Sequence, residues 1–150
     1  MSPQPSDTVG VDERQTTTPS TQEYVLDIPA IDLHEHVVAG DQDEIDQGHV
    51  TAVDWSSRGY PTSCRPGDGC TVWLAGHRST HQAVFARLPE ITAGNSIEIH
   101  FEGEAYAFMV TDVVTVPGSS PPSVIHGDLV LQTSAPSGQR ILIYATTSPP

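Results

Sequence analysis

The sequence contains no lysine. Its six positively charged residues are all arginine and stand against 19 acidic residues, so the formal net charge is −13. Binding to nucleic acid needs clusters of basic side chains that neutralise phosphates, and anionic membrane surfaces attract basic segments for the same reason. We therefore expect neither partner, and the charge itself is typical of a soluble protein surface.

Long hydrophobic runs are also missing. No stretch approaches the roughly 18 apolar residues of a transmembrane helix, and no basic segment followed by an apolar one marks a signal peptide. Residues 1–23 are mostly Pro, Ser, Thr, Gln and Asp, with almost nothing to bury, which predicts a disordered polar linker. Residues 24–146 are expected to form one domain with its own core, and residues 147–150 a short tail.

Cysteine is scarce as well. Cys64 and Cys70 lie six residues apart across a Pro-Gly turn. This spacing predicts a disulfide, and with it an oxidising, extracytoplasmic location; two free thiols are the alternative. A zinc site is not expected here, because two cysteines without a second pair fall short of the usual four ligands.

Eight short segments combine β-branched or aromatic residues with alternating polarity, bounded by Gly, Pro and polar turns. They are residues 24–28, 31–38, 49–55, 71–77, 96–101, 106–116, 128–133 and 140–145. Two short helices are predicted between them, over residues 41–48 and 79–88. This spacing indicates an all-β fold, a closed or nearly closed eight-stranded barrel with one or two short helices.

Two groups of polar residues are candidates for a metal site. His34 and His36 are expected to share one face of a strand, which is either half of a metal site or a solvated face. The acidic stretch 41–48 does not have the spacing of a 12-residue EF-hand calcium loop. We therefore interpret it as a short helix with carboxylates near its N-terminus.

The most informative stretch is the apolar run 71–76, which ends at Gly76 and presents His77 just beyond it. A strand end is a rigid support for a polar side chain, and Gly lets the backbone turn there. Histidine changes charge near neutral pH, so His77 is a candidate acid, base or ion-pair partner, or else an ordinary loop histidine.

Four stretches together resemble the sortases, β-barrel cysteine transpeptidases that attach proteins to Gram-positive cell walls. They are LDIPAI at residues 26–31; PGDG at 66–69 with LAGHR at 74–78; FARL at 85–88 with GNSI at 94–97; and LVLQTS at 129–134 with RILI at 140–143. Order and spacing are most similar to the class E and class F types. The resemblance implies a sorting-signal peptide or cell-wall component as partner, an extracytoplasmic or cell-surface location, and no cofactor.

By the same resemblance, the site residues are His77, Ser134 and Arg140. The family carries its nucleophilic Cys directly after the threonine that closes the seventh strand, and here that position is Ser134. The link from Ser134 to Arg140 is also short, which predicts a displaced arginine. Neither cysteine replaces the nucleophile, since Cys70 lies seven residues before His77, roughly 20 Å along an extended strand.

Three readings of this site remain open. A pseudo-sortase would bind a peptide without turning it over; a sortase could have been inactivated by a Cys-to-Ser change; or Ser134 could itself serve as the nucleophile. A serine hydroxyl reacts only when a neutral base removes its proton, usually with a third group that orients the base. The sequence places no carboxylate against His77, and Asp128 is six residues away from Ser134 on the same strand. A carboxylate within hydrogen-bond reach of His77 would favour the serine enzyme, and an open groove without one would favour the pseudo-sortase.

Overall fold

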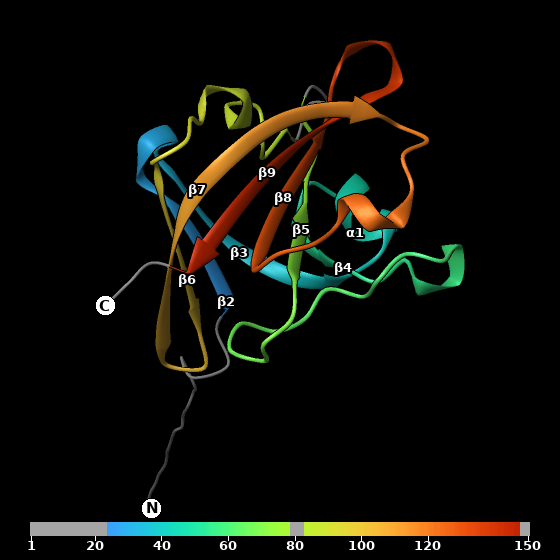
Figure 1. The fold of residues 1–150 in the computed structure, drawn as a ribbon. Helices are drawn as coiled ribbons and strands as arrows, with labels where there is room; N and C mark the ends of the chain where they lie inside the picture. The colour runs from blue at the N-terminus through green and yellow to red at the C-terminus, as the bar shows by residue number, and fades with distance from the viewer. Residues whose placement is uncertain (1–23, 79–82, 148–150) are drawn as a thin grey trace, which may run out of the picture.

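The structure, a computed structural model, describes residues 24–78 and 83–147 and forms a closed barrel of eight strands (Figure 1). The strands are β2 (Tyr24–Ile28), β3 (Leu33–Gly40), β4 (Val50–Val53), β5 (Val72–Ala75), β6 (Ser96–Phe101), β7 (Glu104–Pro117), β8 (Leu129–Ser134) and β9 (Gln139–Thr147). They follow one another around the barrel in the order β2-β3-β4-β5-β8-β9-β7-β6. The predicted all-β fold with eight strands is confirmed, and the expected linker at residues 1–23 lies outside the described residues.

Two neighbouring pairs, β3–β4 and β5–β8, are parallel, and the other six pairs are antiparallel. Parallel neighbours need a connection that crosses from one end of the sheet to the other. Between β3 and β4 this connection carries the short helix α1 (Gln42–Asp46), which confirms the helix predicted from the acidic stretch. Because β5 and β8 run in the same direction, their carboxyl ends meet at one end of the barrel.

The barrel interior is filled by inward side chains, which alternate with outward ones along each strand. Ile97 and Ile99 of β6 and Leu33 and Val37 of β3 are buried, as the alternation predicted, and His34 is exposed. This pattern is the direct consequence of the two-residue period of a strand that has one face toward the core.

A second apolar cluster lies on the opposite face of the β5–β8 region. It contains Ile45, Val53, Trp73, Ala75, Ile125, Val130 and Leu142, with Trp55 and Tyr60 packed against them. All four residues of β5 and the first five of β8 are therefore buried. Strands covered on both faces read as continuous apolar runs rather than alternating ones, which explains the sequence of both segments.

The prediction of a helix over residues 79–88 is wrong for residues 83–88, the part of this range that the structure describes. Residues 84–87 form turns, followed by a 3-10 helix over Leu88–Glu90. The amide of Phe85 donates to the carbonyl of His77 at 2.9 Å, which closes a loop instead of a helical turn. Phe85 and Leu88 are nevertheless fully buried. The apolar pattern therefore identified the buried residues correctly but not the backbone conformation.

Gly76 also has a different role from the one expected. It is not among the residues with left-handed backbone. A Cβ atom at this position would lie 2.7 Å from Val84 Cγ1 and 3.0 Å from the Phe85 ring. Gly76 therefore provides room for the 84–85 loop to pack directly on the end of β5.

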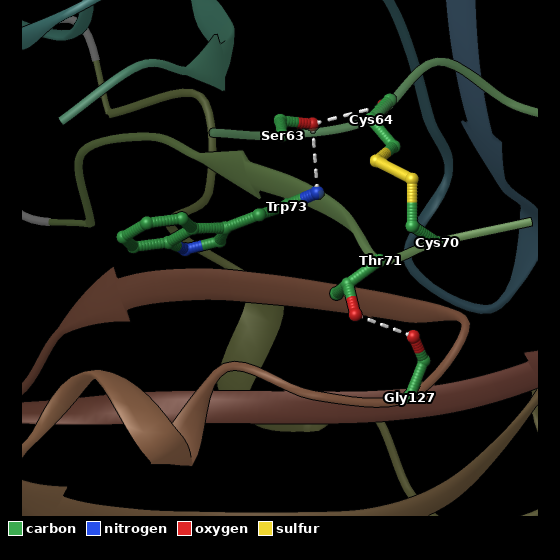
Figure 2. The surroundings of a disulfide bond; sticks show 6 residues. All are labelled: Ser63, Cys64, Cys70, Thr71, Trp73 and Gly127. Carbon is green, nitrogen blue, oxygen red and sulfur yellow. Dashed lines mark hydrogen bonds between the residues drawn. A yellow bond between two sulfur atoms is a disulfide. The ribbon is translucent and has the colours of Figure 1, made fainter. Parts of the chain in front are cut away.

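The predicted disulfide between Cys64 and Cys70 is present, and neither cysteine is free (Figure 2). The hydroxyl of Ser63 donates to the carbonyl of Cys64 and accepts a hydrogen bond of 2.9 Å from the amide of Trp73. On the other side, the Thr71 hydroxyl donates to the carbonyl of Gly127 at 2.6 Å. The cross-linked turn is thereby tied to the start of both β5 and β8.

Candidate functional site

His77 and Ser134 are brought together by the register of β5 and β8. Ala75 is paired with Gln132 in this parallel ladder, so two further residues along each chain place His77 beside Ser134. Two hydrogen bonds hold the strand ends in this register: Gly76 N donates to Gln132 O at 3.2 Å, and Thr133 Oγ1 donates to Gly76 O at 2.8 Å. The strand ends therefore present both side chains at the same end of the barrel.

Arg140 joins them from the next strand. It is the direct partner of Ser134 in the antiparallel β8–β9 ladder. The four residues between β8 and β9 make a tight connection in which Ser137 and Gly138 both have positive φ values, 64° and 75°. The short link thus holds Arg140 opposite Ser134 and does not remove it from the site.

Arg140 is buried, with 9% of the residue exposed. Its guanidinium donates to Gln132 Oε1 at 3.3 Å and to the carbonyl of Ser120 at 3.4 Å, and it lies 5.7 Å from the centre of the Tyr60 ring. Both hydrogen bonds are long. The Nε atom is buried without a hydrogen-bond partner among the described residues. A guanidinium has five N–H donors, so Arg140 has unused capacity for an acceptor group.

His77, Ser134 and Arg140 line one pocket, with a cavity volume of about 150 Å³. Trp55 and Gln42 contribute to its wall. Larger hollows of about 470 and 320 Å³ lie elsewhere on the barrel, and neither is lined by any of the three predicted site residues. The pocket that holds all three residues is therefore the candidate site.

A carboxylate that the sequence did not place lies against the histidine. Oδ1 of Asp46, the last residue of α1, is 2.9 Å from Nε2 of His77. Gln42, one turn earlier, donates through Nε2 to the same Oδ1 atom at 2.9 Å. The Asp46 side chain is 56% exposed and that of His77 is 21% exposed, so solvent screens this pair.

The position of Asp46 follows from the way α1 is built. Asp41 and Glu44 form a capping box at the helix start: the Asp41 carboxylate accepts from Asp43 N, and Glu44 Oε1 accepts from Asp41 N. Ile45 is buried in the second apolar cluster, next to β5 and β8. The only signal in the sequence was the acidic helix itself, because nothing local indicates that its last residue reaches a histidine 31 positions later.

The hydrogen bond from Gln42, and next the one with His77, hold the pKa of Asp46 below its usual 3.8. Asp46 therefore stays ionised well into the acidic range. Asp128 does not contact the site; it accepts hydrogen bonds from the backbone of Thr147 and the hydroxyl of Thr146.

The Ser134 hydroxyl has no hydrogen bond to His77 within the described chain, and Ser134 is exposed at the mouth of the pocket. Its carbonyl accepts a 2.7 Å hydrogen bond from Arg78 Nε. Arg58 lies 5.5 Å from the centre of the Trp55 ring, in the pocket wall. Arg58 and Arg78 thus each contact a residue that lines the pocket, and Arg140 lines the pocket itself.

Solved structures of sortases have a similar barrel. A sortase D5 transpeptidase from Clostridium perfringens superposes with a TM-score of 0.71 at 16% identity, covering 85% of this chain and 79% of the other. Sortase C1 from Streptococcus suis gives 0.72 at 20% identity over 87% and 75% of the two chains. A lid mutant of sortase A from Corynebacterium diphtheriae gives 0.71 at 21% identity over 85% and 70%. Likeness at this level of identity establishes the fold.

A family model described as the sortase domain matches residues 26–148. The chain therefore belongs to the sortase family. Among curated proteins, none matches the sequence significantly. No helix within the described residues is long and apolar enough to cross a membrane.

Proposed function

We propose that this protein is a pseudo-sortase, which binds a sorting-signal-like peptide or a cell-wall component in the pocket between His77, Ser134 and Arg140 and does not turn it over. The observation that carries the proposal is the buried guanidinium of Arg140, whose Nε has no partner in the described chain. A buried, unpaired donor is costly, so a ligand carbonyl or carboxylate oxygen that accepts from it would be bound favourably.

The loss of turnover rests on the nucleophile. By the resemblance, Ser134 stands where the family has cysteine, and both cysteines of this chain are joined to each other. A cysteine ionises near pH 8.5 and a neighbouring cation lowers that further, whereas a serine hydroxyl needs a base in contact with it. Within the described residues, Ser134 has no hydrogen bond to His77, which instead contacts Asp46.

A serine-dependent acyl-transferase or hydrolase is the second candidate, and the Asp46–His77 contact favours it. If Asp46 accepts the Nε2 proton of His77, then Nδ1 is the free base that would take the proton from Ser134 as its oxygen attacks a peptide carbonyl. The same imidazole would then protonate the leaving amine. Against this reading, Asp46 is more than half exposed, whereas the orienting carboxylate of a serine triad is buried.

We place the protein outside the cytoplasm, at the cell surface. The disulfide supports this location, because such bonds persist in oxidising compartments. Membership of the class E or class F types stays a prediction from order and spacing.

The test is intact mass spectrometry of the purified domain mixed with a pool of LPxTG-like peptides, with calorimetry of the same mixtures. The variants are Ser134→Cys and His77→Ala, and the matched control is Ser96→Cys, an exposed thiol at the start of β6. We expect peptide binding but no adduct or product from the unaltered protein, and slow product only from Ser134→Cys. An adduct on the unaltered protein that disappears in His77→Ala would establish the serine enzyme instead. If no peptide binds, both the pseudo-sortase and the serine enzyme are contradicted.

A further inference from the structure

A cluster of metal-ligating side chains lies on the outer face of β3, β2 and β6, across the barrel from the pocket. Asp27 of β2 is paired with His34 of β3 on one side and with Glu98 of β6 on the other. His100 lies two residues beyond Glu98, on the same face of β6. The register of three neighbouring strands therefore assembles two carboxylates and two imidazoles in one small area.

The ligand atoms are already close to one another. One atom from each of Asp27, Glu98 and His100 lies within 4.8 Å of the others. His100 Nε2 is 2.8 Å from Glu98 Oε1, and His34 Nδ1 is 3.8 Å from Asp27 Oδ1. Asp27, Glu98 and His100 are only 32–44% exposed, whereas His34 is 72% exposed. The first three side chains are thus partly covered by their neighbours, and His34 is the most exposed of the four.

We propose that Asp27, Glu98 and His100, with His34 as fourth ligand, bind one Zn²⁺ ion per chain. Zinc takes four nitrogen or oxygen ligands at about 2.0–2.2 Å in a tetrahedron, so its ligand atoms are about 3.4 Å apart. A bound ion would draw the ligand atoms to this spacing by rotation of the side chains, while the paired strands keep their register. Calcium fits poorly, because it takes six to eight oxygen ligands and this cluster offers imidazole nitrogens.

The ion would be structural. The pocket lies at the end of β5 and β8, and β2 and β6 are on the opposite side of the closed barrel order. Binding to residues on three strands would cross-link the ladder from β3 through β2 to β6. Because only the folded chain brings these strands together, zinc would raise the thermal stability of the protein. In the sequence, His34 and His36 together were half of a possible metal site. In the structure, the residues that would complete a site around His34 are 27, 98 and 100, which come from two other strands.

A simpler role for these residues is pairing of histidine with carboxylate, which requires no ion: His34 with Asp27 across two strands, and His100 with Glu98 along β6. The two roles differ in one measurable quantity, the affinity for zinc of matched variants. Glu98→Gln and His100→Gln each remove one ligand while keeping size and polarity. His126→Gln, which removes a histidine stacked on Tyr144, and Glu104→Gln, an exposed glutamate at the start of β7, are the controls.

The experiment is calorimetric titration of the untagged, chelator-treated protein with ZnCl₂, with melting temperatures recorded with and without zinc. We expect one Zn²⁺ per chain, at least tenfold weaker binding in Glu98→Gln and in His100→Gln, and unchanged affinity in both controls. The melting temperature should rise with zinc in the unaltered protein and not in a variant that combines Glu98→Gln with His100→Gln. Circular dichroism confirms that each variant is folded.

Three results would overturn the proposal. One is the absence of binding up to millimolar zinc. Another is binding whose affinity is the same in Glu98→Gln and His100→Gln as in the unaltered chain. The last is binding that is lost in His77→Gln, which would assign the ion to the pocket near Asp46.

Discussion

Oδ1 of Asp46 lies 2.9 Å from Nε2 of His77, although the two residues are 31 positions apart. The contact joins the end of α1 to the end of β5, at the mouth of the pocket that also contains Ser134 and Arg140. It occupies one of the two ring nitrogens of His77 and leaves only Nδ1 available to Ser134 or a ligand. A serine enzyme would need Nδ1 of His77 to take the proton of Ser134, whereas a binding site would not.

The Asp46 carboxyl should titrate below pH 3.8 in the folded protein. Its pKa is lowered first by the hydrogen bond from Gln42 and then by that with His77. A lowered folded-state pKa means that the contact stabilises the fold fully above pH 3.8, and that this stability is lost as the pH falls through the folded-state pKa. Carboxyl-carbon NMR titration measures the value directly.

The variants Gln42→Leu and His77→Ala separate the two causes of this shift. Each should raise the pKa of Asp46, and Gln42→Leu should raise it more. A carboxyl that titrates at or above 3.8 in the unaltered protein would show that neither hydrogen bond is formed in solution.

Arg140→Lys should weaken peptide binding about tenfold or more. A hydrogen bond to a charged group contributes about 1.5–3 kcal/mol, and 1.4 kcal/mol corresponds to a factor of ten in affinity. An ammonium group also cannot reproduce the planar donor pattern of the guanidinium. Calorimetry with an LPxTG-like peptide measures the loss, and Arg65→Lys, at an exposed arginine, is the matched control. Equal affinity in both variants would remove Arg140 from the binding site.

Gln132→Leu should destabilise the protein by about 1–3 kcal/mol, the cost of leaving a buried donor without its acceptor. Gln132 Oε1 accepts from Trp73 Nε1 at 3.0 Å and from Arg140 at 3.3 Å, and the change removes both contacts. Urea unfolding measures the difference. The control is Gln139→Leu, an exposed glutamine at the start of β9, which should change stability much less. The prediction is wrong if the two variants are equally stable.

Replacing both Cys64 and Cys70 by serine should lower the free energy of unfolding by about 2 kcal/mol. The figure follows from the loss of loop-closure entropy for a loop with a sequence separation of six. Guanidinium unfolding of the oxidised protein and the double variant gives the difference. The unaltered protein under strong reductant should match the variant, and a difference between those two would point to an effect of the serines themselves.

Much of the fold could be predicted from the sequence because it is encoded locally. Residues 96–101 alternate so regularly that the predicted strand coincides with β6, and the Pro-Gly turn between Cys64 and Cys70 correctly predicted their disulfide. The helix prediction failed for residues 83–88 because an apolar pattern indicates which side chains are buried and not which backbone conformation they adopt. Here the hydrogen bond from the Phe85 amide to the His77 carbonyl favours a turn.

For the candidate site, the sequence by itself determined that His77 and Ser134 end apolar strands and that Arg140 begins the strand that follows. Only the tertiary structure decided that these residues share a pocket, because the parallel pairing of β5 with β8 aligns the two strand ends. The contact of Asp46 with His77 and the pairing of Glu98 with Asp27 also became visible only in the tertiary structure. Strand position depends on neighbouring residues along the chain, whereas such contacts depend on which strands become neighbours when the barrel closes.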